Sequence, residues 1–220
     1  MKINIAIDGP SAAGKSTISD IIANKLGYIH LDTGAMYRAV AYKALKENLE
    51  IDDEENIVKM INKMDLKQTP DGKIFLDGED VSEAIRTNEM SMGASNVSKL
   101  KNVRKALVAM QQKIAENGGY ILDGRDIGTV VLTDAPVKIY MVASAEARAN
   151  RRVIQNKEKG IEADYDLILE DINKRDYQDS HRENSPLKQA DDAILIDTSD
   201  LTIDEVVDKI MVLINEVVGE

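Results

Sequence analysis

Apolar residues follow two different spacings along the chain, and these spacings divide it into strands and helices. Short apolar runs rich in β-branched residues predict strands at residues 3–7, 28–31, 120–122, 137–143 and 193–196. Between these runs, apolar residues recur every three or four positions, as at Ile57, Ile61 and Met64, which predicts amphipathic helices. The alternation of strands and helices indicates an α/β fold, with a five-stranded parallel sheet flanked by helices.

The ends of several predicted helices carry recognisable signals. The apolar stripe from Ile18 to Leu26 stops before Gly27, a residue type that often follows a helix. Further helices are predicted over 35–45, from about 97 to 118, after Ser144, and from about 164 towards 182, while the polar residues 156–163 predict a loop. Two pairs of residues have the spacing of a capping box: Asp52 with Glu55, and Thr202 with Glu205.

The pattern changes between residues 66 and 86. Turn signals at 70–73 and 77–80 flank the apolar run at 74–76. This arrangement predicts a small antiparallel β insertion that is separate from the alternating α/β core.

A phosphate-binding sequence joins the first predicted strand to the first helix. Residues 9–17 read Gly9-Pro10-Ser11-Ala12-Ala13-Gly14-Lys15-Ser16-Thr17 and match the P-loop pattern G-x-x-x-x-G-K-[ST]. In a P-loop the backbone N–H groups surround phosphate oxygens, the lysine reaches the β- and γ-phosphates, and the first hydroxyl residue binds Mg²⁺. The alternative is a glycine turn with an exposed lysine, which the strand before and the helix after disfavour. We therefore predict that residues 9–17 bind a nucleoside triphosphate, with Ser16 on the Mg²⁺.

Composition and charge exclude several classes of function. The 220 residues contain no cysteine and only two histidines, so disulfides and a zinc-type site are not expected. A net charge of −11 disfavours binding to nucleic acids or anionic membranes. No apolar run approaches the ~18 residues of a membrane span, and the first strand begins directly after Met1 without a signal peptide. We expect a cytoplasmic protein.

The arginines indicate what receives the phosphoryl group. A kinase for an anionic acceptor needs a second group of cations, because two phosphate-bearing molecules must approach each other. Four of the nine arginines lie at or near predicted strand ends or in one charged segment: Arg38, Arg125, Arg175 and Arg182. Because ligands of open α/β sheets bind at the carboxyl ends of the strands, these guanidinium groups are expected to converge on one site.

Several segments resemble the bacterial cytidylate kinases. The resemblance is carried by residues 7–17, by 31–38 (LDTGAMYR), by 123–129 (DGRDIGT) and by Arg175 with Asp179. Residues 80–87, Ser95 and Arg104 are also similar, and the resemblance extends over essentially the whole chain. It implies one P-loop kinase unit: a core of about 1–34, 100–150 and 180–220, a nucleoside monophosphate-binding region of about 35–99 that holds the β insertion, and a short lid of about 151–179.

The resemblance also implies roles for individual residues. The catalytic group comprises Lys15, Arg38, Arg125, Asp126 and Arg182. ATP is bound by residues 9–17 together with Arg152, in the segment of Arg148, Arg151 and Arg152 that resembles a mobile lid. The acceptor CMP is bound by Thr33, Arg38, Ser95, Arg104, Arg125, Asp126, Arg175, Asp179 and Arg182, with Ser95, Arg104 and Asp126 at the cytosine.

Other residues are expected to contribute less. Ala12 and Ala13 stand where many relatives have a glycine, which the loop tolerates if their φ angles are negative. We interpret His30 as an ordinarily packed strand residue and His181 as a neighbour of the site.

The sequence therefore predicts a monomeric enzyme that transfers the γ-phosphoryl group of MgATP to CMP or dCMP. One alternative is a P-loop kinase for another small acceptor, such as UMP, AMP or shikimate. The other is a nucleotide-binding switch without an acceptor, which would not need the four arginines.

Overall fold

A five-stranded parallel sheet forms the centre of the computed structural model, which describes residues 2–158 and 160–219. The strands lie in the order β2-β6-β1-β7-β8, and every neighbouring pair is parallel. They are β1 Ile5–Asp8, β2 Ile29–Asp32, β6 Tyr120–Gly124, β7 Val137–Val142 and β8 Ile194–Asp197. The predicted α/β fold is confirmed, with strand boundaries that differ from the predicted ones by one or two residues at most positions.

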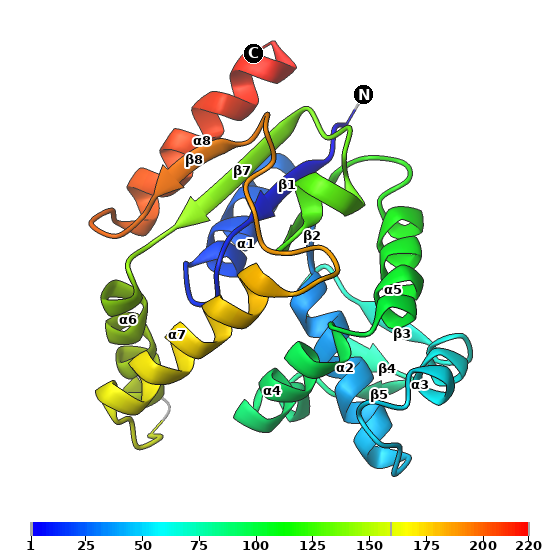
Figure 1. Ribbon diagram of the computed structural model, residues 1–220. Helices are drawn as coiled ribbons and strands as arrows, with labels where there is room; N and C mark the ends of the chain where they lie inside the picture. The colour runs from blue at the N-terminus through cyan, green and yellow to red at the C-terminus, as the bar shows by residue number, and fades with distance from the viewer. Residues whose placement is uncertain (1, 159, 220) are drawn as a thin grey trace.

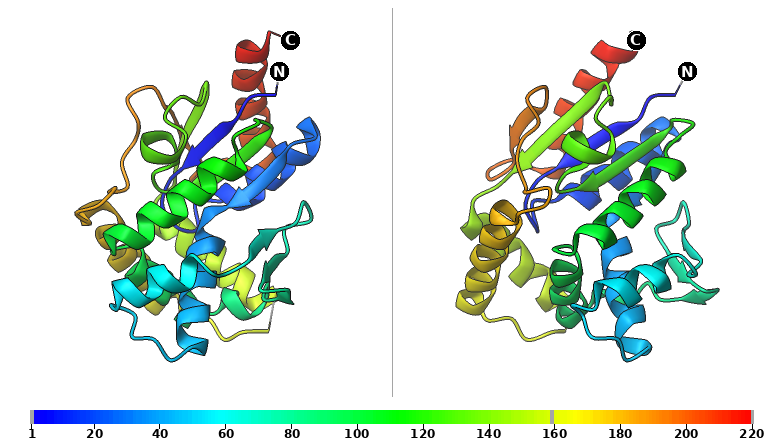
Figure 2. Two further views of the ribbon diagram at one scale, coloured as in Figure 1. Left: turned by 90° about the vertical axis from the view of Figure 1, so that its right-hand side faces the viewer. Right: turned by 45° about the vertical axis from the view of Figure 1, so that its right-hand side comes forward.

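Helices cover both faces of this sheet (Figures 1 and 2). Ile18 and Ile22 of α1 and Ile210 of α8 pack on one face in a buried apolar cluster, and Leu107 of α5 packs in another cluster on the opposite face. The α-helices are α1 Lys15–Leu26, α2 Thr33–Lys46, α3 Glu54–Ile61, α4 Asn88–Val97, α5 Lys101–Ile114, α6 Ala145–Glu158, α7 Tyr165–His181 and α8 Ile203–Val218.

The predicted β insertion is confirmed as a separate antiparallel sheet of β3 Leu66–Gln68, β4 Ile74–Leu76 and β5 Glu79–Asp80. A side chain attaches it to the edge of the parallel sheet. The Gln68 amide nitrogen donates to the His30 carbonyl at 3.0 Å, and its oxygen accepts from the Asp32 N–H at 3.0 Å. Gln68 thus satisfies two backbone groups on the outer edge of β2.

Several predicted helix ends are confirmed and others are wrong. Gly27 ends α1 in the left-handed conformation (φ 62°), and Thr202 with Glu205 forms the predicted capping box. Asp53, not Asp52, caps α3, because its carboxylate accepts from the Asn56 N–H.

The remaining corrections concern where helices begin and end. The helix predicted from about residue 97 to 118 is shorter, since α5 begins at Lys101 and ends at Ile114, and the preceding helix α4, Asn88–Val97, was not predicted. The loop predicted over 156–163 is shorter, because α6 continues to Glu158.

A 3₁₀-helix, η1 Ala84–Arg86, precedes α4, and a π-helix, η2 Ile127–Val131, follows β6. In the described ranges, no helix is both long and apolar enough to cross a membrane.

Candidate active site

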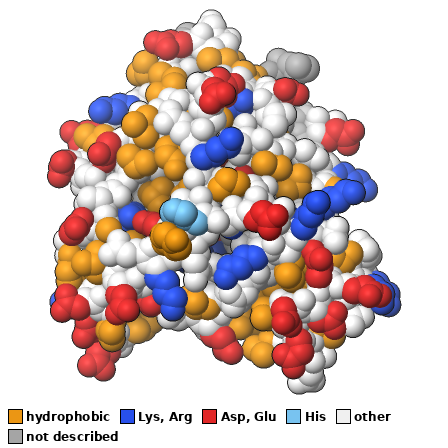
Figure 3. Space-filling model, viewed as in Figure 1, with side chains coloured by type: hydrophobic (Ala, Val, Ile, Leu, Met, Phe, Trp, Pro, Cys, Tyr) orange, Lys and Arg blue, Asp and Glu red, His pale blue; other side chains and the backbone are white. Residues whose placement is uncertain are grey.

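A cavity of about 800 Å³ opens at the carboxyl ends of the parallel strands. The loop between β1 and α1 lines it on one side, and α2, α4, α6 and α7 extend around it. Figure 3 shows the lower edge of this face indented between two lobes, with Lys and Arg side chains near the indentation and Asp and Glu side chains over the lobes. Most of the predicted site residues line the cavity. Its lining includes Lys15 and eight arginines but only six acidic side chains, so the cavity is cationic although the chain as a whole is negative.

The β1–α1 loop has the backbone geometry of a phosphate cradle. Gly9 has a φ of 150°, and a Cβ there would lie 2.0 Å from the Met141 carbonyl oxygen, so only glycine fits between β1 and β7. Gly14 has a φ of 93° at the start of α1. Ala12 also has a positive φ, of 59°, so the condition under which an alanine is tolerated here, a negative φ, is not met. A positive φ favours glycine, so the alanine at this position strains the loop.

Lys15 is buried at the base of this loop. Its ammonium donates to the Gly9 and Pro10 carbonyls, at 2.8 Å each. Burial and then the charge of Arg125 lower the pKa of Lys15 from 10.5 to about 7. Phosphate oxygens bound beside Lys15 would favour its charged form and raise this pKa again.

Asp123, at the end of β6, is a site residue to which the sequence assigned no role. Its Oδ2 accepts from the Ser16 hydroxyl at 2.8 Å. An acidic residue at the end of a strand beside the P-loop strand is the signal that would have found it, because such a residue commonly helps to hold Mg²⁺ in P-loop proteins.

His30 is not the ordinarily packed residue that was expected. Its Nδ1 lies 2.6 Å from Asp20 Oδ1, and its Nε2 lies 2.9 Å from Asp123 Oδ1. Burial alone would lower the pKa of His30, but the hydrogen bonds to Asp123 and Asp20 outweigh it and raise the pKa to about 10. His30 is therefore an imidazolium between two carboxylates.

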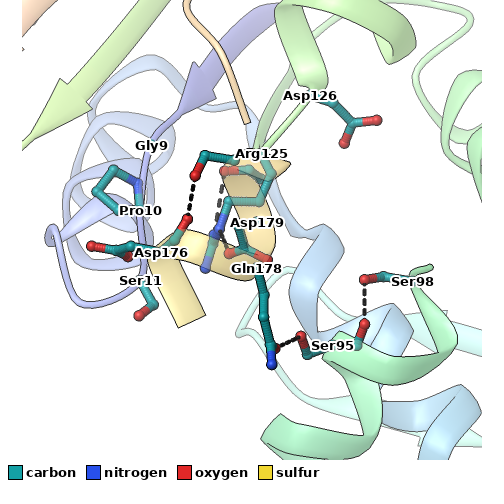
Figure 4. A network of polar contacts seen from close by, with 12 residues as sticks. Gly9, Pro10, Ser11, Ser95, Ser98, Arg125, Asp126, Asp176, Gln178 and Asp179 are labelled. Carbon is teal, nitrogen blue, oxygen red and sulfur yellow. Dashed lines mark hydrogen bonds and ion pairs between the residues drawn. The ribbon is translucent and has the colours of Figure 1, made fainter. Parts of the chain in front are cut away.

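Arg125 lies between the P-loop and α7 (Figure 4). Its Nε donates to Asp179 Oδ2 at 2.8 Å. Burial would raise the pKa of Asp179, but the charge of Arg125 and its hydrogen bond outweigh this effect and hold the pKa below its usual range. Arg38, on α2, pairs with Asp32 at 2.8 Å.

Two further arginines, on and after α7, have guanidinium atoms that make no hydrogen bond. Within residues 2–158 and 160–219, the buried Nε of Arg175 and NH2 of Arg182 have no hydrogen bond. Burial, followed by the charge of Arg125, lowers the pKa of Arg175 from 12.5 to about 10. The Arg182 NH2 instead makes a long ion pair, 3.8 Å from Asp126 Oδ1. Buried guanidinium N–H groups without hydrogen bonds are costly, so these two arginines are suited to an anionic ligand.

Arg104 and Asp126 form a buried ion pair at another part of the cavity wall. The Arg104 guanidinium also lies over the Tyr37 ring, 5.5 Å from its centroid. Tyr37 therefore holds Arg104 in place. Although adjacent in sequence, Asp126 and Arg125 point to different parts of the cavity (Figure 4).

Ser95 and Thr33 line the cavity with hydroxyl groups that already have protein partners. The Ser95 hydroxyl donates to Gln178 Oε1 on α7 at 3.2 Å, across the cavity from α4 (Figure 4). The Thr33 hydroxyl donates to the Asp123 carbonyl at 2.7 Å.

The three arginines of α6 differ from one another. Arg148 is buried (4% exposed) and pairs with both oxygens of Asp176, at 3.0 and 2.6 Å. The lid role expected for its segment stays a prediction. Arg151 bonds to the Thr198 carbonyl. Arg152 is exposed and lines the cavity.

Two segments far apart in the sequence, α6 and residues 198–206 around the start of α8, also line the cavity. Beside polar residues such as Arg152, they contribute apolar side chains to which the sequence assigned no role: Ile154, Leu201, Ile203 and Val206. No motif marks these residues, because only the folded chain brings the two segments together.

Comparisons with known proteins agree on one family. The family model described as cytidylate kinase matches residues 5–216. A cytidylate kinase from Caldicellulosiruptor bescii is 54% identical over 99% of this chain and 97% of its own length. The cytidylate kinase of Bacillus subtilis is 51% identical over 96% of this chain and 95% of its own length.

Solved structures with low sequence identity share the fold. An uncharacterized protein from Eubacterium ventriosum has a TM-score of 0.55 at 12% identity, with 98% of this chain and 99% of that chain covered. A gluconokinase from Sinorhizobium meliloti has a TM-score of 0.50 at 12% identity, with 100% and 97% covered.

Proposed function

This chain belongs to the cytidylate kinase family, and we propose that it transfers the γ-phosphoryl group of MgATP to CMP or dCMP, giving ADP and CDP or dCDP. The observation that carries the proposal is the position of the arginines. Arg38, Arg125, Arg175 and Arg182 line the same cavity as the P-loop. A nucleotide-binding switch has no need for this second cationic cluster.

The donor would bind along the P-loop. Backbone N–H groups of the loop and the start of α1 would hold the phosphates, and Lys15 would turn from the Gly9 and Pro10 carbonyls to the β- and γ-phosphate oxygens. The apolar side chains of Leu201 and Ile203 in the cavity wall are suited to the adenine.

The residues beside Lys15 fit Mg²⁺. Ser16 and Asp123 offer hard oxygen ligands 2.8 Å apart at the edge of the loop. The described residues contain no cluster of three or more His, Cys, Asp or Glu side chains that could hold a metal alone. This is expected for Mg²⁺, which is commonly bound by one or two carboxylates together with substrate phosphates. Bound with ATP, the ion would neutralise charge on the transferring phosphoryl group.

The acceptor would bind opposite the donor. The guanidinium atoms of Arg175 and Arg182 that make no hydrogen bond would bind the CMP phosphate and sugar, and Arg125, between the P-loop and α7, would lie between the two substrates. Asp126, Arg104 and Ser95 offer an acceptor and two donors to the edge of cytosine, which has an amino donor and two acceptors. The reaction then depends mainly on positioning and on neutralising charge.

Enclosure of the cavity would protect the transferring group from water. The exposed Arg152 on α6 is placed to fold over the ATP phosphates, and we propose that residues 151–179 act as the lid and residues 35–99 as the acceptor-binding region. The monomeric state and the cytoplasmic location stay predictions.

The decisive test is a coupled ADP-release assay with MgATP and each of CMP, dCMP, UMP, AMP and shikimate. We expect kcat/KM to be at least tenfold higher for CMP and dCMP than for the other acceptors. If no acceptor accelerates ADP release above that with ATP alone, the kinase proposal fails. The Tm of a nucleotide-binding switch would also not rise with CMP alone, whereas CMP bound at an acceptor site raises the Tm of the protein.

The cytosine pocket can be tested separately. Arg104→Met should raise the KM for CMP much more than the KM for ATP, because Arg104 lies on the acceptor side. Lys99→Met, an exposed cation between α4 and α5, is the matched control and should change neither. Equal increases in both KM values for Arg104→Met would remove Arg104 from the cytosine pocket.

A further inference from the structure

We propose that His30 is a positioning residue that holds the Asp123 carboxylate, and through it the Ser16 hydroxyl, in the arrangement that the donor side of the site requires. The inference rests on the proposed function and assigns a role to a side chain that does not itself line the cavity.

Three elements bring the interacting residues together. His30 of β2 is paired in register with Ile121 of β6, so Asp123, two residues further along β6, points to the same face of the sheet. The helix α1 covers this face and supplies Asp20. His30 is only 7% exposed, between Asp20 on one side and Asp123 on the other.

The hydrogen bonds leave the imidazole one orientation. Nδ1 is 2.6 Å from Asp20 Oδ1, and Nε2 is 2.9 Å from Asp123 Oδ1. Carboxylate oxygens only accept hydrogen bonds, so both ring nitrogens must carry a proton and donate. A ring held at both nitrogens cannot rotate without losing a charge-assisted hydrogen bond.

The orientation of His30 is transmitted to Asp123. The terminal torsion of an aspartate is soft unless its oxygens have partners. Asp123 has both oxygens engaged, Oδ1 by His30 and Oδ2 by the Ser16 hydroxyl at 2.8 Å. The chain Asp20–His30–Asp123–Ser16 therefore fixes the two oxygen ligands that we assign to Mg²⁺. Residues behind metal ligands typically change metal affinity or activity by about 10–100-fold when mutated.

The experiment separates positioning from a general loss of stability. Calorimetry on the whole protein gives the Kd of ATP in Mg²⁺ and in EDTA. The Kd in EDTA divided by the Kd in Mg²⁺ measures what Mg²⁺ contributes to binding. We expect His30→Phe, or His30→Gln if the first variant folds poorly, to reduce this ratio about tenfold. The Kd in EDTA should change little, because the P-loop backbone and Lys15 are intact.

A double variant tests whether hydrogen bonds are responsible. In His30→Gln the new amide can donate to Asp123, but its oxygen then faces the Asp20 carboxylate. Adding Asp20→Asn gives that oxygen a donor and restores a continuous chain of hydrogen bonds. We expect the double variant to recover most of the wild-type Kd ratio, and His181→Gln, at the exposed histidine, to retain all of it.

The possible outcomes are distinguishable. If His30→Phe lowers Tm but keeps the wild-type Kd ratio, His30 only stabilises the fold and the inference is overturned. The same holds if the double variant behaves like His30→Gln alone. If the wild-type protein binds ATP equally in Mg²⁺ and in EDTA, Ser16 and Asp123 do not hold Mg²⁺ and the inference is overturned, while the ATP site stands. If it binds no ATP in either condition, the proposed function fails.

Discussion

Lys15 should take up a proton when ATP binds. In the empty protein, burial and the charge of Arg125 lower its pKa from 10.5 to about 7. At 1.36 kcal/mol per pKa unit, this difference corresponds to about 5 kcal/mol that disfavours the charged form. Triphosphate oxygens within reach of the ammonium reverse the effect, because an adjacent negative charge favours the protonated lysine.

The sign of the effect fixes the pH at which to measure it. The pKa of Lys15 is lower in the folded protein than in the unfolded chain, so folding releases a proton between pH 7 and 10.5. Below pH 7 Lys15 is charged in both states, and the full cost of burying its charge then lowers the stability of the fold. At pH 8, about one empty molecule in eleven carries a protonated Lys15. ATP is then almost fully ionised, since the last phosphate pKa is near 6. Binding should therefore take up about 0.9 proton per ATP at pH 8.

Calorimetry in two buffers with different ionisation enthalpies measures this uptake directly. Neither Asp8, with a pKa raised by burial to about 6, nor His30, with a pKa of about 10, changes its charge near pH 8. Lys15→Arg is the control, because a guanidinium stays charged at this pH and its binding enthalpy should not depend on the buffer. A wild-type binding enthalpy that is the same in both buffers would refute the reasoning, since Lys15 would then already be charged in the empty site.

Three further predictions concern individual residues. Ala12→Gly should raise the free energy of unfolding by about 1 kcal/mol, measured by denaturant titration, because glycine removes the strain of a φ of 59°; an unchanged or lower value would contradict the strain. Arg148→Met should lower the free energy of unfolding by about 3 kcal/mol, because it leaves the Asp176 carboxylate without its buried partner. Arg152→Met, one helical turn away and exposed, should instead lower kcat and leave Tm unchanged; the opposite pattern in these two variants would show that the lid arginine is misassigned.

The fold could be predicted from the sequence because its signals are local. The apolar runs of the five strands, the turn signals around 74–76 and the P-loop pattern each lie within a few neighbouring residues. Helix ends are harder to predict where two neighbouring residues can each cap the helix, as Asp52 and Asp53 can before α3. Either aspartate can accept from a helix N–H, and the choice of Asp53 depends on the path of the chain into α3.

The site residues that the sequence missed depend on distant partners. His30 meets Asp20 and Asp123, which lie 10 and 93 residues away, so no spacing signals the contact. Arg148 and Arg152 share one face of α6, and their four-residue spacing suggests equal roles. They differ because one helical turn moves Arg152 from the packed end of the helix to the rim of the cavity. The φ of Ala12 follows from the loop closing around the phosphate site, not from the residue type.

The two bonds that Gln68 makes to β2 have a consequence for how the protein behaves when it is stressed. An outer strand with free N–H and C=O groups is a template on which another chain can add a strand and start aggregation. Gln68 occupies one such donor and one such acceptor on β2, so the small antiparallel sheet protects this border of the large one. Local unfolding of residues 66–80 would expose that border while the parallel sheet stays intact, and molecules in this state would be the ones that associate.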